Sequence, residues 1–163
     1  MQGSSQHMAA TALLAAFWCL MRVSEYSVSP RSNHCLSASA VDFRVRRPGT
    51  HVFDMIPSHR LDATEFRYVQ AVRITHHTAK NRQASDPVAS WFTASHTSTH
   101  EILDLPRALF DWARHAQLSA DDPFFSRPNP LGGACLPISS HDVEYHQVMC
   151  SCFGLGPYPL QLS

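Results

Sequence analysis

Lysine is almost absent from this chain of 163 residues: Lys80 is the only one, and the other positively charged side chains are arginines. Charged residues make up only 16% of the sequence, below the quarter or so that is usual for soluble domains. Lysine plus arginine equals aspartate plus glutamate, 13 each, so net charge predicts no polyanionic partner, although charge placement still can. Arginine suits bidentate phosphate contacts and also forms ordinary ion pairs, so the bias fits either use.

A long hydrophobic run is also lacking. The longest extends from Met8 to Met21, which is shorter than the roughly 20 residues that a membrane-spanning helix needs. The preceding MQGSSQH has no lysine or arginine, and the bulky FWCLM end offers no signal-peptide cleavage site. Because its large side chains cover every face, we expect a core helix enclosed by other elements, with no membrane contact. The expected location is intracellular: nuclear in a eukaryote and cytoplasmic otherwise.

The sequence contains no CxxC pair, and its five cysteines are odd in number. We therefore expect reduced thiols, which are typical of intracellular proteins, and no disulfide framework. A zinc site formed by Cys150, Cys152 and a histidine is an alternative, but this spacing matches no standard ligand pattern. We predict neither a metal nor another cofactor.

Periodicity along the chain predicts an α+β fold. The segments 40–45, 69–75 and 88–94 alternate apolar and polar residues, as strands do. The expected helices are 8–21, a second that starts at Pro106, and 139–153. We predict one domain over residues 1–163, mostly helical, with a small antiparallel three-stranded sheet.

The run LMRVSEY, residues 20–26, follows the apolar helix and resembles the first catalytic box of the tyrosine recombinase (phage integrase) family. That family places a strand pair next, with a lysine in the connecting turn, and VRITHHTAKNRQ matches this with Lys80. DPFF, 122–125, and the amphipathic segment 139–155, which ends in Gly-Leu, follow in the family's order. The shared order of these short motifs carries the resemblance, which covers roughly residues 8–163.

The resemblance implies DNA recombination or integration, with DNA as the partner and self-association in a recombination complex. Arg22 would bind the non-bridging oxygens of the phosphorane transition state, and Lys80 would protonate the departing 5′-oxygen. Glu25 would orient Arg22, and Arg82 would contact a nearby DNA phosphate. The plainer interpretations are a salt bridge between Arg22 and Glu25 and solvated side chains in a loop.

The sequence departs from the family after the amphipathic segment. It stops at PYPLQLS, where the family has a His-x-x-Arg box, and all four tyrosines precede that point. We therefore expect the front part of a recombinase catalytic domain, which binds DNA at most and cannot cleave it. The alternatives are a non-catalytic DNA- or protein-binding module on the same scaffold and an unrelated histidine-rich metal-binding α+β protein.

Four further arginines lie in or beside the predicted strands: Arg44, Arg46, Arg47 and Arg73. They are candidates for phosphate contacts. For most of them we prefer a different interpretation, in which charge at a strand edge discourages aggregation.

Overall fold

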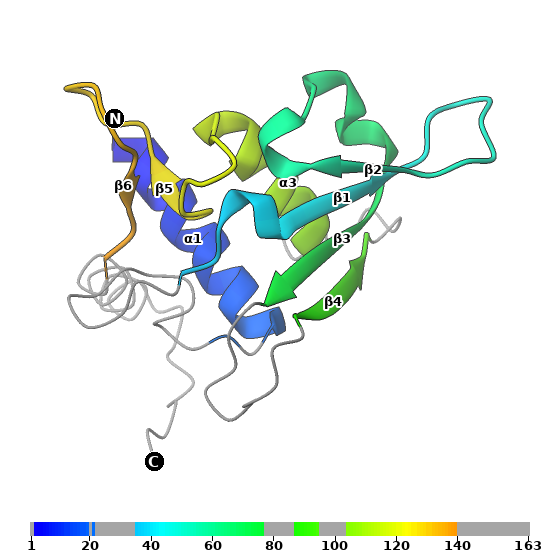
Figure 1. The fold of residues 1–163 in the computed structure, drawn as a ribbon, viewed down its shortest axis with the longest axis horizontal. Helices are drawn as coiled ribbons and strands as arrows, with labels where there is room; N and C mark the ends of the chain where they lie inside the picture. Colours follow the sequence, from blue (N-terminus) through cyan, green and yellow to red (C-terminus); the bar gives the residue numbers. More distant parts are fainter. Residues whose placement is uncertain (1, 20, 22–34, 77–86, 95–103, 140–163) are drawn as a thin grey trace, which may run out of the picture.

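The computed structural model describes residues 2–19, 21, 35–76, 87–94 and 104–139 (Figure 1). Its α-helices are α1 (Gln2–Cys19) and α3 (Leu105–Ala116). Its strands are β1 (Val41–Val45), β2 (Asp54–Pro57), β3 (Val69–His76), β4 (Val88–Thr93), β5 (Ser126–Arg127) and β6 (Leu136–Pro137). Three short 3₁₀ helices, η1 (Ala38–Ala40), η2 (Ser58–Arg60) and η3 (Ala63–Tyr68), complete the described elements.

The main sheet has the strand order β2-β1-β3-β4, and every neighbouring pair is antiparallel. The three strands predicted from alternation are confirmed as β1, β3 and β4. The prediction of only three strands is wrong, because β2 adds a fourth beside β1, with Arg44 opposite Met55. This strand is four residues long and lies at an edge, so it lacks the long alternation that identifies a strand in sequence.

The α+β class is confirmed. The helix expected to start at Pro106 is α3, whose second residue is that proline. The Asp104 side chain caps it by accepting a hydrogen bond from the backbone N–H of Arg107 at 3.4 Å. The expected predominance of helix depends on 139–153, of which residues 140–153 lie outside the described part.

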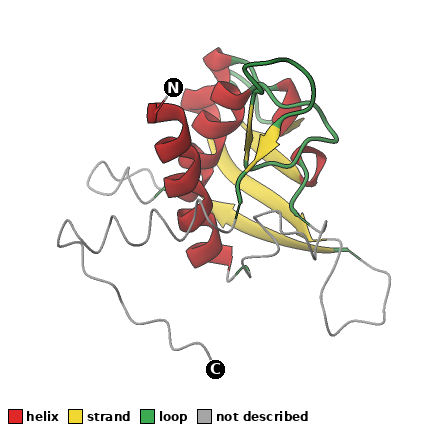
Figure 2. Cartoon of the chain, turned by 90° about the vertical axis from the view of Figure 1, so that its left-hand side faces the viewer, coloured by secondary structure: helices red, strands yellow, loops and turns green. Residues whose placement is uncertain are grey.

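One face of the main sheet forms the core. Val41, Phe43 and Val45 alternate along β1 and are fully buried, and they lie beside the buried Val72 and Ile74 of β3. Helix α3 packs against this face, and α1 packs against α3. Figure 2 shows both helices on the same side of the sheet. Alternation therefore leaves the other side chains of the same strands on the opposite face, which neither α1 nor α3 covers and which we call the open face.

Helix α1 differs from the prediction of a helix enclosed on every side. Ala12 and Ala15 are fully buried, whereas Phe17 is 73% exposed and Trp18 is 47% exposed. The buried side of α1 is formed mostly by small residues, whereas the bulky side chains near its end are exposed. No helix in the described part of the chain is long and apolar enough to cross a membrane.

Candidate nucleic-acid interface

The residues to which the resemblance assigns roles are Arg22, Glu25, Lys80 and Arg82. All four lie outside the described residues. The structure does describe the strand pair that flanks Lys80: β3 and β4 are antiparallel, and His76 lies opposite Val88 where the connection leaves the sheet. The predicted strand pair is confirmed, and the predicted roles stay predictions.

Charged and aromatic side chains of the described residues gather on the open face of the sheet. In one row across the strands, Trp91 of β4 lies opposite Arg73 of β3, which lies opposite Asp42 of β1. In the next row on the same face, Arg44 of β1 lies opposite Met55 of β2. Directly opposed residues project to the same side of a sheet, so these side chains share one surface.

At the β1–β2 end of this surface, two arginines lie against one ring. The guanidinium carbon of Arg44 is 3.6 Å from the centroid of the Phe53 ring, and that of Arg46 is 5.7 Å from it. The Arg46 Nε also donates to the Thr50 carbonyl at 3.4 Å. Within the described residues neither arginine forms an ion pair with a carboxylate. Cation–π contact with the ring orients both charges, and it leaves the guanidinium N–H groups available apart from the Arg46 Nε–H that Thr50 accepts.

The third arginine of the surface is neutralised. Arg73 donates from Nε and from an Nη to the same Asp42 oxygen, at 3.0 Å and 2.6 Å. Its guanidinium carbon also lies 5.8 Å from the centroid of the Trp91 ring. The Asp42 carboxylate therefore balances Arg73 and holds the guanidinium beside the indole.

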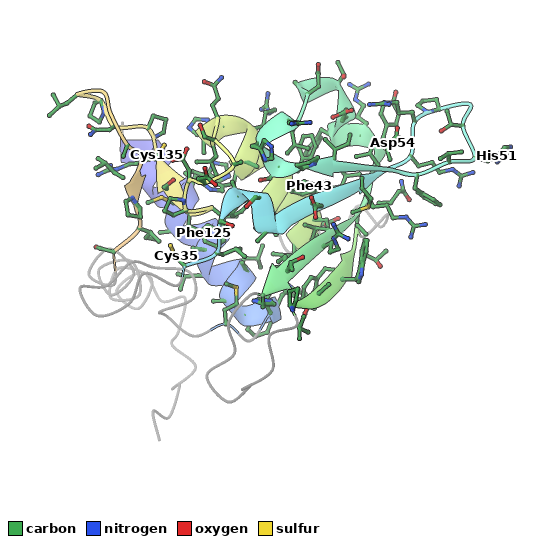
Figure 3. All side chains as sticks on the ribbon, viewed as in Figure 1. Cys35, Phe43, His51, Asp54, Phe125 and Cys135 are labelled. Carbon is green, nitrogen blue, oxygen red and sulfur yellow. The ribbon has the colours of Figure 1, made fainter. Side chains whose placement is uncertain are left out.

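Arg47 has a structural role at the base of the β1–β2 hairpin. It donates to Asp54 at 2.8 Å and to Glu65 at 2.6 Å, and the Glu65 side chain is only 8% exposed. Two contacts raise the pKa of Arg47: the hydrogen bond to Glu65 has the larger effect, and the negative charge of Asp54 has the next largest. Figure 3 shows Asp54 at the base of this hairpin and His51 at its outer end.

The Glu65 side chain that Arg47 binds also caps η3. Its carboxylate accepts from the Asp62 backbone N–H at 3.2 Å, while the Asp62 side chain accepts from the backbone N–H of Thr64 at 2.8 Å. Hydrogen bonds from Thr64 lower the pKa of Asp62. This reciprocal capping box fixes the carboxylate that Arg47 binds, so Arg47 joins the hairpin to η3.

We call the surface formed by five residues on the open side of the sheet the arginine–aromatic face: Arg44, Arg46, Phe53, Arg73 and Trp91. Its charge is positive, because Asp42 balances one arginine and the other two have no carboxylate partner among the described residues. Of the four arginines considered from sequence, it includes all except Arg47. The aromatic members were missed, since Phe53 precedes a short strand and Trp91 has no marker beyond its place in an alternating run.

Comparisons with protein-family models, with curated proteins and with solved structures found no match. Among the described residues, no three histidine, cysteine, aspartate or glutamate side chains are grouped as metal ligands. A function for this chain therefore has to follow from its own geometry. Among the described residues, the arginine–aromatic face is the feature that points most directly to a ligand.

Proposed function

We propose that this chain binds DNA through the arginine–aromatic face and belongs to a DNA recombination or integration protein with a tyrosine recombinase-like scaffold. The observation that carries the DNA-binding part is the pairing of Arg44 and Arg46 on the Phe53 ring without a carboxylate partner in the described residues. Guanidinium groups bind two phosphate oxygens at once, and DNA presents phosphates in a continuous row.

The recombinase part of the proposal is supported by the order of elements. The apolar helix α1 precedes the antiparallel strands β3 and β4, which flank the connection that contains Lys80. Helix α3 and the loop containing Phe124 and Phe125 follow in the order of the family motifs. In this proposal Arg22 and Lys80 contact the DNA phosphate, Glu25 orients Arg22, and Arg82 binds a neighbouring phosphate. The role proposed for these 163 residues is DNA binding, and it assigns the nucleophile of strand cleavage to none of their four tyrosines.

The phosphate contacts are tested by titrating a fluorescent DNA duplex with the chain at several salt concentrations. We expect log K to fall with log salt by about 0.9 for each phosphate that is neutralised. Replacing both Arg44 and Arg46 with alanine should reduce the slope by about two such contacts and weaken binding at low salt. Arg114 is a matched control, because it lies on α3 and pairs with Asp111 at 3.3 Å. Its replacement with alanine should leave the slope unchanged.

Two results would contradict the proposal. Binding that does not depend on salt, or a slope that the Arg44 and Arg46 substitutions do not change, would remove the arginine–aromatic face as a phosphate site. A covalent adduct of this chain with a nicked suicide substrate would show that it carries its own nucleophile, and the assigned roles would then be wrong.

A further inference from the structure

We infer that the arginine–aromatic face accommodates single-stranded nucleic acid in preference to a duplex, with Trp91 as the surface on which an unpaired base stacks. This inference rests on the proposed function, because it assigns the same arginines to phosphates and adds a site for a base.

The indole of Trp91 is open to solvent on a strand whose other residues do not cover it. Trp91 is 51% exposed, and its neighbours on the same face of β4, two residues away in each direction, are the exposed Ala89 and Thr93. The adjacent Phe92 packs toward the core instead. An exposed tryptophan between small neighbours presents its ring to a ligand, as in stacking platforms for nucleic acids.

The position of this ring is also restrained. Arg73 lies 5.8 Å from the ring centroid, and its guanidinium is held by two hydrogen bonds to Asp42, whose side chain is only 13% exposed. The indole is therefore supported by a fixed charge pair, and less side-chain freedom is lost when a base stacks on it. A neutralised neighbour also avoids placing a bare carboxylate beside the phosphates of the strand.

The second ring of the face has a different environment. The Arg44 guanidinium lies 3.6 Å from the Phe53 ring centroid and so occupies the position that a stacked base would take. Phe53 therefore orients arginines, while Trp91 is available for a base. Trp91 on β4 and Arg44 on β1 are separated by β3, and Arg44 lies two residues along β1 from Asp42, which is in the same row as Trp91. Strand spacing and rise put their backbones about 10 Å apart across the sheet and about 7 Å apart along it. One strand of a few nucleotides spans that separation.

Stacking on Trp91 distinguishes single strands from duplexes. A base in a duplex is already stacked and paired, so it must leave the helix before it can lie on an external ring, at a cost in free energy. An unpaired base is free to do so. Sequence preference should be weak, because every base has a flat face, and the sugar is not selected by stacking itself.

The test compares three fluorescent probes: oligothymidine of about 15 nucleotides, oligouridine of the same length, and a DNA duplex of the same length. We expect the wild-type chain to bind at least one single strand more tightly than the duplex. Replacing Trp91 with alanine should weaken single-strand binding by about 5- to 150-fold and leave duplex binding unchanged. Trp91→Phe should retain most of the affinity. Trp18→Ala is the matched control, since Trp18 is similarly exposed but lies on α1.

Each outcome of this test either supports the inference or overturns it. Tighter binding of either single strand, with loss in Trp91→Ala alone, supports the inference, and the preferred probe identifies DNA or RNA as the source. If the duplex binds more tightly than both single strands, or Trp91→Ala binds them normally, the inference is overturned. In that case an effect of the Arg44 and Arg46 substitutions would still support the proposed function. If none of the three probes binds, both proposals fail. Circular dichroism of each variant confirms that the fold is kept.

Discussion

The two faces of the main sheet are made from alternate residues of the same strands, yet they use aromatic side chains in opposite ways. On the inner face Phe43 is fully buried and meets Phe110 of α3, with ring centroids 5.3 Å apart. On the outer face Trp91 stays half exposed beside Arg73. The comparison teaches that a ring contributes to folding where other apolar groups cover it. Where Arg73 and small residues border it, as at Trp91, the ring stays accessible to a ligand.

The two faces also differ in their charged side chains. No charged side chain of β1 or β3 lies among the buried residues of the inner face. On the outer face Arg73 is balanced by Asp42, while Arg44 and Arg46 are held by Phe53. A guanidinium on a ring keeps its hydrogen-bond donors for a ligand, whereas one in an ion pair has used some of them.

The largest expected effect is a loss of stability that substitution on the inner face causes and substitution on the outer face does not. Replacing Phe43 with alanine removes a fully buried ring and leaves a cavity against Phe110, so the free energy of unfolding should fall by about 3–5 kcal/mol. Arg44→Ala, the next residue on the opposite face, should change it by less than about 1 kcal/mol. Urea unfolding followed by circular dichroism measures both. Equal losses would mean that the outer face also belongs to the core.

A smaller effect concerns Asp42, the carboxylate that pairs with Arg73 on the outer face. Asp42→Asn removes the charge that balances Arg73 but keeps an acceptor, so stability should fall by about 0.5–1.5 kcal/mol. The face then carries one more positive charge, and we expect tighter nucleic-acid binding, with a salt dependence steeper by about one phosphate contact. Titration at two salt concentrations checks this. Weaker binding would show that positioning of the indole by Asp42 matters more than charge.

The last effect is on the reactivity of Cys19, in the helical layer behind the inner face. Burial raises the pKa of Cys19 from 9.0 to about 12. The folded protein therefore favours the neutral thiol: the resulting stability is complete below about pH 9 and is lost as the pH rises toward 12. At neutral pH the thiolate is about a thousandfold scarcer than in an ordinary thiol. A more basic thiolate is intrinsically more nucleophilic, so the net alkylation should be about thirtyfold slower.

Iodoacetamide labelling with mass spectrometry of the Cys19 peptide measures this rate at pH 8. The same labelling in denaturant supplies the control, because unfolding restores an ordinary thiol. A native rate equal to the denatured rate would mean that solvent reaches Cys19 freely, and that α1 does not bury this side chain.

Much of the fold was predictable because its signals are local. Alternation over 40–45, 69–75 and 88–94 identified β1, β3 and β4, and Pro106 marked the start of α3. Strand β2 was not predictable, since its four residues offer no clear alternation and it exists by pairing with β1. The outward orientation of Phe17 was missed for a similar reason, because it depends on which side of α1 meets α3.

The candidate site was predictable only in part. Arginine at positions 44, 46 and 73 was a candidate for phosphate contacts, although charge at a strand edge was the preferred interpretation for most of them. The structure brings these three side chains to one face. Nothing in sequence showed that Phe53 would lie under Arg44, because the two residues meet only through the hairpin register. The roles of Arg22 and Lys80 stay predictions, since neither residue is among those the structure describes.

By itself, the sequence determined the strands β1, β3 and β4 and which of their side chains alternate, since periodicity acts within a few residues of the chain. Only the tertiary structure decided which charges are balanced. Arg73 and Asp42 are 31 positions apart and meet because β1 and β3 pair in one register. A shift of that register by one residue would move Arg73 to the inner face, where an uncompensated charge is unfavourable. This register, together with the pairing of β3 with β4, leaves Arg44, Arg46 and Trp91 together on the outside.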